Sequence, residues 1–174
     1  MSTDGDGAPS PRVRIVGIGS PTAGDDLGWR LAEALRAADI GRGFPDGAVD
    51  IVVCDHPGHL LLGVLAGLHL AIIVDAMRGG AAPGGLRRLD MDDLDEIGAW
   101  TSHGFGVAGI LALGRALGVL PPRVVLYGIE AGPPACMPSP SVWVAQCEGA
   151  LREEIGQALV NRTEGSPGVC GGHL

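Results

Sequence analysis

The chain has 174 residues, 46% hydrophobic and 18% charged, with a formal net charge of −8, so it can form one domain around a substantial core. The negative charge argues against nucleic acid or an anionic membrane as the partner. Apolar runs such as Leu68–Val74 are too short to cross a bilayer, and the first residues, MSTDGDGAPSPR, lack the apolar segment of a secretory signal. We therefore expect a cytoplasmic protein.

Short apolar runs rich in β-branched residues predict strands that are buried on both faces of a parallel sheet. In chain order they are Val13–Gly17, Val49–Cys54, Ala71–Val74 and Val124–Tyr127. A further segment, Leu86–Met91, is more charged, which favours a strand at the sheet edge.

Helical patterns separate these strands. They span Asp26–Ala38, Leu60–Leu68, Gly104–Leu117 and Ser141–Val160. The last has Ser139 as a candidate N-cap and Pro140 in its first turn. The alternation predicts a three-layer α/β/α fold with a mostly parallel, twisted sheet of about five strands, one edge strand being antiparallel. We expect a single domain over residues 12–162, a disordered lead-in over 1–11 and a flexible tail over 163–174.

The loop after the first strand reads Gly17-Ile18-Gly19-Ser20-Pro21-Thr22-Ala23-Gly24-Asp25-Asp26. A dinucleotide-binding loop would need its third glycine earlier, and a P-loop would need Lys-Ser/Thr where Asp25-Asp26 stands. Two carboxylates at a helix N-terminus would repel a phosphate but could hold a cation. The simpler alternative is that the two aspartates form a helix N-cap.

Asp75 and His103 are the other candidates for chemistry. Asp75 ends the run Leu70–Val74, and a carboxylate beside such a buried strand is costly unless it is paired or binds a metal. His103 lies just before a predicted helix, where a lone histidine is commonly structural, but imidazole with two carboxylates suits a transition metal. In open α/β sheets ligands bind beyond the carboxyl ends of the strands. The candidates for a metal site at this edge are therefore one of the pair Asp25-Asp26, together with Asp75 and His103.

Other metal-ligand residues are weaker candidates. His56 and His59 have His-x-x-His spacing, but Pro57-Gly58 between them indicates a turn. Cys170 and His173 lie in the expected flexible tail, which would lose conformational entropy on binding. The cysteines form no Cys-x-x-Cys pair, so we expect inert thiols.

Taken together, the motifs resemble those of the hydrogenase maturation endopeptidase family. That family has Gly-x-Gly-Asn-Pro-x-x-x-Asp-Asp/Glu after its first strand, matched by Gly17–Asp26 with Ser20 in place of Asn. Its Ile-Ile-Val-Asp-Ala motif is matched by Ile72–Ala76, its Ser-x-His motif by the Ser102-His103 pair, and its Gly-Ile-Glu motif by Gly128–Glu130. The expected Asp-Gly-Gly-Thr after the second strand reads Asp-His-Pro-Gly, and the segment after the Gly-Ile-Glu motif also departs from the family.

The resemblance implies an endopeptidase that removes a C-terminal extension from a nickel–iron hydrogenase large-subunit precursor after nickel insertion. It implies that Asp26, Asp75 and His103 are the metal-binding and catalytic residues, that the nickel is carried by the substrate, and that no organic cofactor is needed. The three residues could hold a metal that polarises the scissile carbonyl, or dock on the substrate's nickel while a carboxylate acts as base.

Three alternatives remain open at this point. The chain could be a metallochaperone or assembly factor that binds the same precursor without cutting it. It could be another metal-assisted peptidase or amidohydrolase on the same scaffold. A nucleotide-binding oxidoreductase is a third alternative, although the glycine fingerprint that it needs is missing.

Overall fold

The computed structural model describes residues 13–21, 25–55, 60–93 and 105–160. The elements in these ranges, in chain order, are β1 (Val13–Ile18), α1 (Leu27–Ala37), β2 (Val49–Cys54), α2 (Leu60–Leu65), β3 (Leu70–Met77), β4 (Leu86–Asp90), α4 (Phe105–Leu117), β5 (Arg123–Glu130) and α5 (Pro140–Val160). Short 3-10 turns occupy Met91–Asp93 and Pro134–Cys136. The expected lead-in and tail lie outside the described residues.

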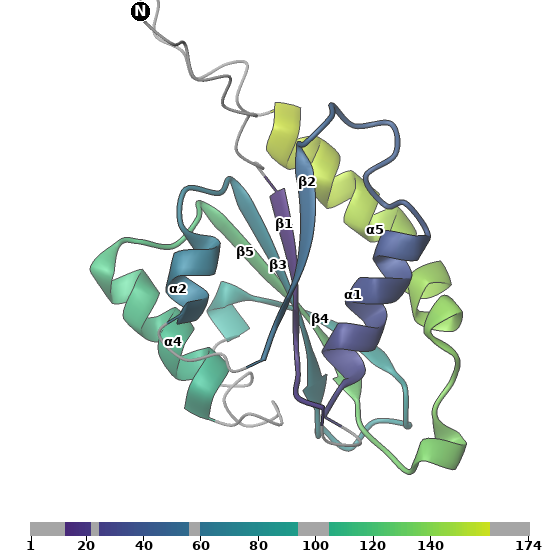
Figure 1. The fold of residues 1–174 in the computed structure, drawn as a ribbon. Helices are drawn as coiled ribbons and strands as arrows, with labels where there is room; N and C mark the ends of the chain where they lie inside the picture. The colour runs from purple at the N-terminus through teal and green to yellow at the C-terminus, as the bar shows by residue number, and fades with distance from the viewer. Residues whose placement is uncertain (1–12, 22–24, 56–59, 94–104, 161–174) are drawn as a thin grey trace, which may run out of the picture.

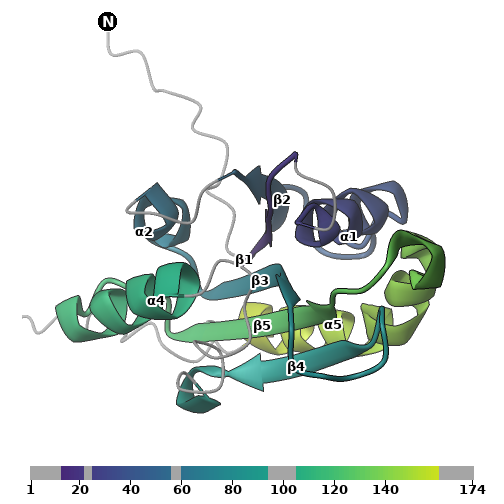
Figure 2. The same ribbon diagram turned by 90° about the horizontal axis from the view of Figure 1, so that it is seen from below.

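The described strands form one 5-stranded sheet in the order β2-β1-β3-β5-β4. Parallel pairing joins β2, β1, β3 and β5, while β4 runs antiparallel to β5 at the edge. Helices cover both faces of the sheet, α1 and α5 on one side and α2 and α4 on the other (Figures 1 and 2). The predicted three-layer fold with one antiparallel edge strand is confirmed.

The core is divided by the sheet into two clusters. One cluster lies between the sheet and the helices α1 and α5 and includes Ile72, Val74 and Trp143. The other lies between the sheet and the helices α2 and α4 and includes Ile73 and Leu111. All eight residues of the central strand β3 are buried. A strand buried on both faces needs a continuous apolar run, which is why the sequence of β3 lacks the alternation of a half-exposed strand.

Two details differ from the sequence predictions. β2 is not buried on both faces: most of it is half-buried and Val53 is 45% exposed, because β2 is the second edge of the sheet. β3 continues to Met77, so Asp75 lies inside the strand and not after it. The strand continues because β5 pairs with it as far as Met77 opposite Glu130.

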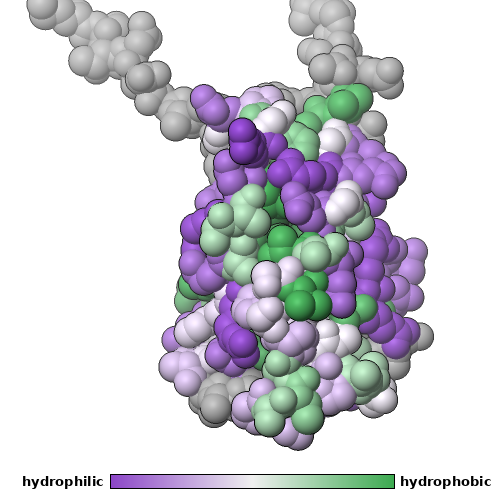
Figure 3. Space-filling view, turned by 90° about the vertical axis from the view of Figure 1, so that its right-hand side faces the viewer, coloured by the Kyte–Doolittle hydropathy of each residue, from purple (hydrophilic) through white to green (hydrophobic). Residues whose placement is uncertain are grey.

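The outer face formed by α1 and α5 is largely hydrophilic, with a smaller hydrophobic area near its centre (Figure 3). None of the helices in the described ranges is both long enough and apolar enough to span a membrane.

We predict that the tyrosine will titrate far above its ordinary range in the native protein. Tyr127 is the sole tyrosine of the chain, and burial, followed by the nearby Glu154 carboxylate, raises its pKa to about 12. The unfolded chain ionises near pH 10, so any stability that this residue contributes is present below pH 10 and is lost as the pH rises towards 12. Absorbance near 295 nm should give midpoints about 2 pH units apart for native and urea-unfolded protein. A native midpoint near 10 would contradict the burial of this hydroxyl.

Candidate active site

The candidate site lies where the strand order changes direction. From β1 the chain moves outward to β2 and then returns to the other side of β1 to form β3. In open α/β sheets this topological switch point is where ligands bind, at the carboxyl ends of the strands. Asp26 follows β1 and Asp75 lies near the end of β3, so the two carboxylates belong to the two strands that flank the switch point.

Close packing of α1 against these strands places Asp26 at this edge. Asp26 is the N-cap residue of α1, and a β-carbon at Gly28 would overlap the carbonyl oxygens of Ile18 and Val74. Val74 directly precedes Asp75, so the first turn of α1 rests on the backbone beside the second carboxylate. Only glycine allows this approach, because any side chain would meet main-chain atoms that cannot move aside.

Asp25 and Asp26 have different roles in the loop. The Ser20 hydroxyl donates to Asp25 Oδ2 at 2.7 Å, and the Ser20 N–H donates to the Asp25 carbonyl at 3.0 Å. Asp26 occupies the N-cap position without making a side-chain cap hydrogen bond. The predicted capping pair is therefore divided: Asp25 closes the loop, whereas the carboxylate of Asp26 does not cap the helix.

A double-mutant cycle should separate these two aspartates. We expect a coupling free energy of about 1 kcal/mol between Ser20→Ala and Asp25→Ala, because each substitution removes one partner of the same hydrogen bond. The cycle of Ser20→Ala with Asp26→Ala should show coupling close to zero. Urea unfolding of the wild type, the three single variants and the two double variants measures both values, and equal coupling in the two cycles would contradict this division of roles.

Asp75 lies on the sheet face that α2 and α4 cover. It alternates with Val74 and Ala76, which belong to the core under α1 and α5. Its side chain is therefore on the opposite face, with Ile73. Asp75 is 2% exposed, and its Oδ1 accepts the N–H of Ala76 at 2.8 Å. A buried carboxylate at a switch point is unusual for a structural residue and typical of a functional one.

His103 lies outside the described residues, so the predicted third site residue stays a prediction. The helix that follows it, α4, begins at Phe105, and its last turns lie beside the start of β5, where Gly114 and Gly118 line a pocket with Val124. Since α4 ends at the amino edge of β5, it begins towards the carboxyl edge, on the same sheet face as Asp75.

The complete metal site is also a prediction that the structure does not test. Within the described ranges, no three or more His, Cys, Asp or Glu side chains are grouped so that they could hold a metal ion. The weaker histidine candidates His56, His59 and His173 lie outside those ranges, as does Cys170. Of the cysteines that the structure describes, Cys54 and Cys147 are buried and Cys136 is exposed, and no disulfide joins any two of these three.

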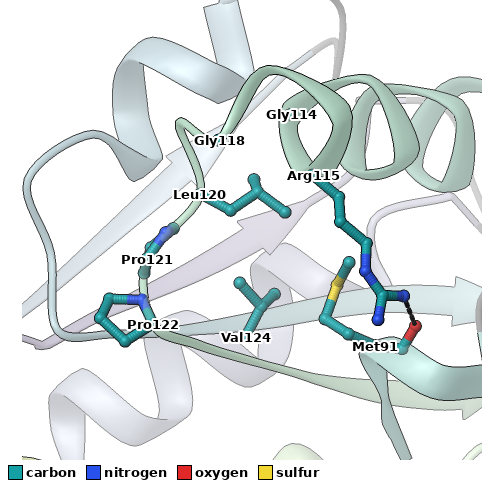
Figure 4. Close-up of a pocket in the computed structure, with 8 residues that line it drawn as sticks. All are labelled: Met91, Gly114, Arg115, Gly118, Leu120, Pro121, Pro122 and Val124. Carbon is teal, nitrogen blue, oxygen red and sulfur yellow. Dashed lines mark hydrogen bonds between the residues drawn. The ribbon is translucent and has the colours of Figure 1, made fainter.

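A pocket of about 270 Å³ lies at the edge of the sheet opposite to the one where Asp75 lies. Figure 4 shows the residues that line it. Arg115 closes one side by donating to the Met91 carbonyl at 3.2 Å, and Leu120, Pro121 and Val124 form an apolar wall. Its residues come from the end of α4 and the beginning of β5, at the amino edge of the sheet. It contains no carboxylate or imidazole and is not the candidate site.

Two residues at the site edge were missed by the sequence analysis. Gly28 was not singled out, although an isolated glycine inside an amphipathic helix is a known sign of close packing. Glu130 was noted only as part of a motif. In the structure it is 5% exposed, and its carboxylate accepts the N–H groups of Gly79 and Gly80 at 2.9 and 3.1 Å. No local pattern in the sequence predicts this contact.

Comparison with known proteins gives the family of this chain. A family model described as hydrogenase maturation protease (HycI) matches residues 29–134, which is more than half of the chain. The chain belongs to the hydrogenase maturation protease family. It is therefore a protease, as the motifs predicted, and this membership disfavours the alternatives of an assembly factor and an oxidoreductase. The matched range includes Asp75, His103 and Glu130 but begins after Asp26.

Solved structures of such proteases share the fold. The hydrogenase maturating endopeptidase HybD from E. coli is 26% identical, with a TM-score of 0.61, and the match covers 87% of this chain and 93% of that one. An endopeptidase from Escherichia coli is 24% identical over 87% and 93% of the two chains, with a TM-score of 0.62. The [NiFe] hydrogenase maturation protease HycI from Thermococcus kodakarensis KOD1 is 24% identical over 87% and 94%, with a TM-score of 0.54. None of the curated protein sequences compared with the chain matches it.

Proposed function

We propose that this protease removes the C-terminal extension of a nickel–iron hydrogenase large-subunit precursor after nickel has been inserted. We propose further that Asp26, Asp75 and His103 recognise the substrate's nickel and carry out the cleavage. The observation that carries the proposal is Asp75, a carboxylate only 2% exposed on the central strand, at the switch point where α1 brings Asp26. Family membership supplies the reaction class.

The chemistry of the side chains supports recognition of a metal that arrives with the substrate. Two carboxylates and an imidazole are suitable ligands for a borderline divalent cation such as nickel. The acidic side chains at this edge attract a cationic centre. The formal net charge of −8 of the whole chain acts in the same direction. Binding that centre would fix the precursor so that its scissile peptide lies at the switch point.

Cleavage then needs a group that takes a proton from the attacking water. A carboxylate within hydrogen-bond reach of that water can act as this base, and the proton is later given to the leaving amine. Asp75 is the better candidate, because it is only 2% exposed and lies on the central strand at the switch point. Asp26, at the half-buried start of α1, is better placed to contact the substrate first.

The test is to incubate the purified protein with the precursor, either loaded with nickel or free of it, and to record masses. The proposal expects a shorter large subunit and a released C-terminal peptide only with the nickel-loaded precursor. Formation of a complex without loss of mass would support the assembly-factor alternative. Equal cleavage of both precursors would refute recognition of nickel.

A further inference from the structure

Glu130 is a buried charged residue at the site edge that the proposed chemistry does not use. It is the last residue of β5 and lies opposite Met77, just as Gly128 lies opposite Asp75. Because side chains alternate along a strand, Glu130 and Asp75 share the sheet face that α2 and α4 cover. The Met77 side chain lies over Gly128, where any β-carbon would overlap its sulfur.

The Glu130 residue holds both ends of the loop that joins β3 to β4, residues 78–85. Its carboxylate accepts the N–H groups of Gly79 and Gly80 at 2.9 and 3.1 Å. Its main chain accepts the N–H of Gly84 and donates to the Gly85 carbonyl, both at 2.8 Å. Charge-assisted hydrogen bonds to a buried carboxylate are strong, so this loop has a defined position at the edge where Asp75 lies.

The loop presents a cation at that edge. Arg78 immediately follows β3 and is exposed. Among the described residues no ion pair is found for Arg78, whereas Arg14, Arg88 and Arg152 each have an acidic partner. Its neighbour Gly79 is one of the two residues whose N–H groups Glu130 fixes, so the position of the Arg78 backbone depends on Glu130.

We propose that Glu130 is a positioning residue for peptide cleavage, because it holds the β3–β4 loop so that Arg78 binds an oxygen acceptor of the substrate polypeptide beside Asp75. A guanidinium only donates hydrogen bonds, so the acceptor is a carbonyl or a carboxylate oxygen. This inference rests on the proposed function for its substrate. It adds a specificity contact that the Asp26, Asp75 and His103 set does not contain.

The experiment compares the cleavage kinetics of Glu130→Gln, Arg78→Ala and the double variant on the nickel-loaded precursor. Each single substitution is expected to raise KM about tenfold, the loss of one charge-assisted contact, with a smaller change in kcat. In the Arg78→Ala background, Glu130→Gln should add little, since both act through one contact. If KM rises more steeply with salt for the wild type than for Arg78→Ala, the acceptor is a carboxylate, and an equal salt dependence of the two proteins identifies a carbonyl.

Glu154→Gln is the matched control. Glu154 is also a buried glutamate, 6% exposed, but it lies on α5 at the opposite sheet face, where Arg88 Nε donates to its Oε1 at 2.6 Å. Both glutamine variants should lower Tm, but only Glu130→Gln should change KM when all are assayed well below the lowest Tm. An equal KM change in Glu154→Gln would overturn the proposal.

Two further results separate this inference from the proposed function. Arg78 is exposed, so Arg78→Ala should fold even if Glu130→Gln does not, and an unchanged KM for Arg78→Ala would overturn the inference. If the wild type binds the precursor without cleaving it, the proposed function fails. The Kd of that complex then replaces KM, and the same ranking of the variants is expected.

Discussion

Replacing Asp75 with asparagine is expected to lower the rate of precursor cleavage by at least about 100-fold, the usual contribution of a general acid or base. Asparagine has nearly the same shape and keeps an oxygen that can accept the Ala76 N–H, which Asp75 Oδ1 accepts at 2.8 Å. It cannot take a proton from water at neutral pH and is a weaker ligand for a metal. The expected loss is therefore chemical and not a loss of fold.

The measurement is single-turnover cleavage of the nickel-loaded precursor, followed by mass, alongside thermal unfolding of each variant. Asp93→Asn is a suitable control because Asp93 lies in the turn after β4, where its carboxylate accepts the N–H of Asp90 at 2.8 Å, away from the switch point. It should cleave at the wild-type rate. A folded Asp75→Asn variant with wild-type activity would remove Asp75 from the proposed chemistry.

Replacing Gly28 with alanine is expected to lower the free energy of unfolding by about 3 kcal/mol and to reduce cleavage strongly, as overpacking of a rigid contact does. The new β-carbon would overlap the carbonyl oxygens of Ile18 and Val74, so α1 must move away from β1 and β3. Asp26 is the N-cap of this helix and would move with it. Urea unfolding and the cleavage assay measure the two effects.

A glycine elsewhere provides the control for Gly28→Ala. Gly149 lies in the interior of α5, and a β-carbon there would meet nothing within 4 Å. Gly149→Ala should raise the free energy of unfolding by about 0.5–1 kcal/mol, because alanine has the higher helix propensity. The same substitution thus has opposite signs at the two positions. A stable, active Gly28→Ala variant would contradict the close packing that places Asp26.

The sequence was sufficient for most of the fold. A strand that is apolar on both faces, such as Ile72–Val74, must be covered by helices on both sides, so the alternation of strands and helices predicted the α/β class. The more charged segment Leu86–Met91 predicted the edge strand. The limits of the strands were less accurate, since pairing extends β3 to Met77. The predicted burial of β2 was too high. Its edge position depends on the order of the strands, which the residues of Val49–Cys54 do not reveal.

The sequence predicted some residues of the candidate site better than others. Asp75 was identified from its cost of burial, and it is indeed 2% exposed. The sequence could not decide between Asp25 and Asp26 as the residue tied up in the loop, because that depends on the Ser20 hydroxyl. The role of His103 depends on the family resemblance and stays a prediction.

The chain by itself determined which segments are strands, which are helices, and which carboxylates stand near strand ends, because local apolar periodicity and the cost of burying charge act along the sequence. Only the tertiary structure decided which strands flank the switch point, where α1 meets the backbone at Gly28, and which loop Glu130 holds. Glu130 and Gly79 are 51 residues apart, and hydrogen bonds over such separations form only after the sheet has brought the strands together.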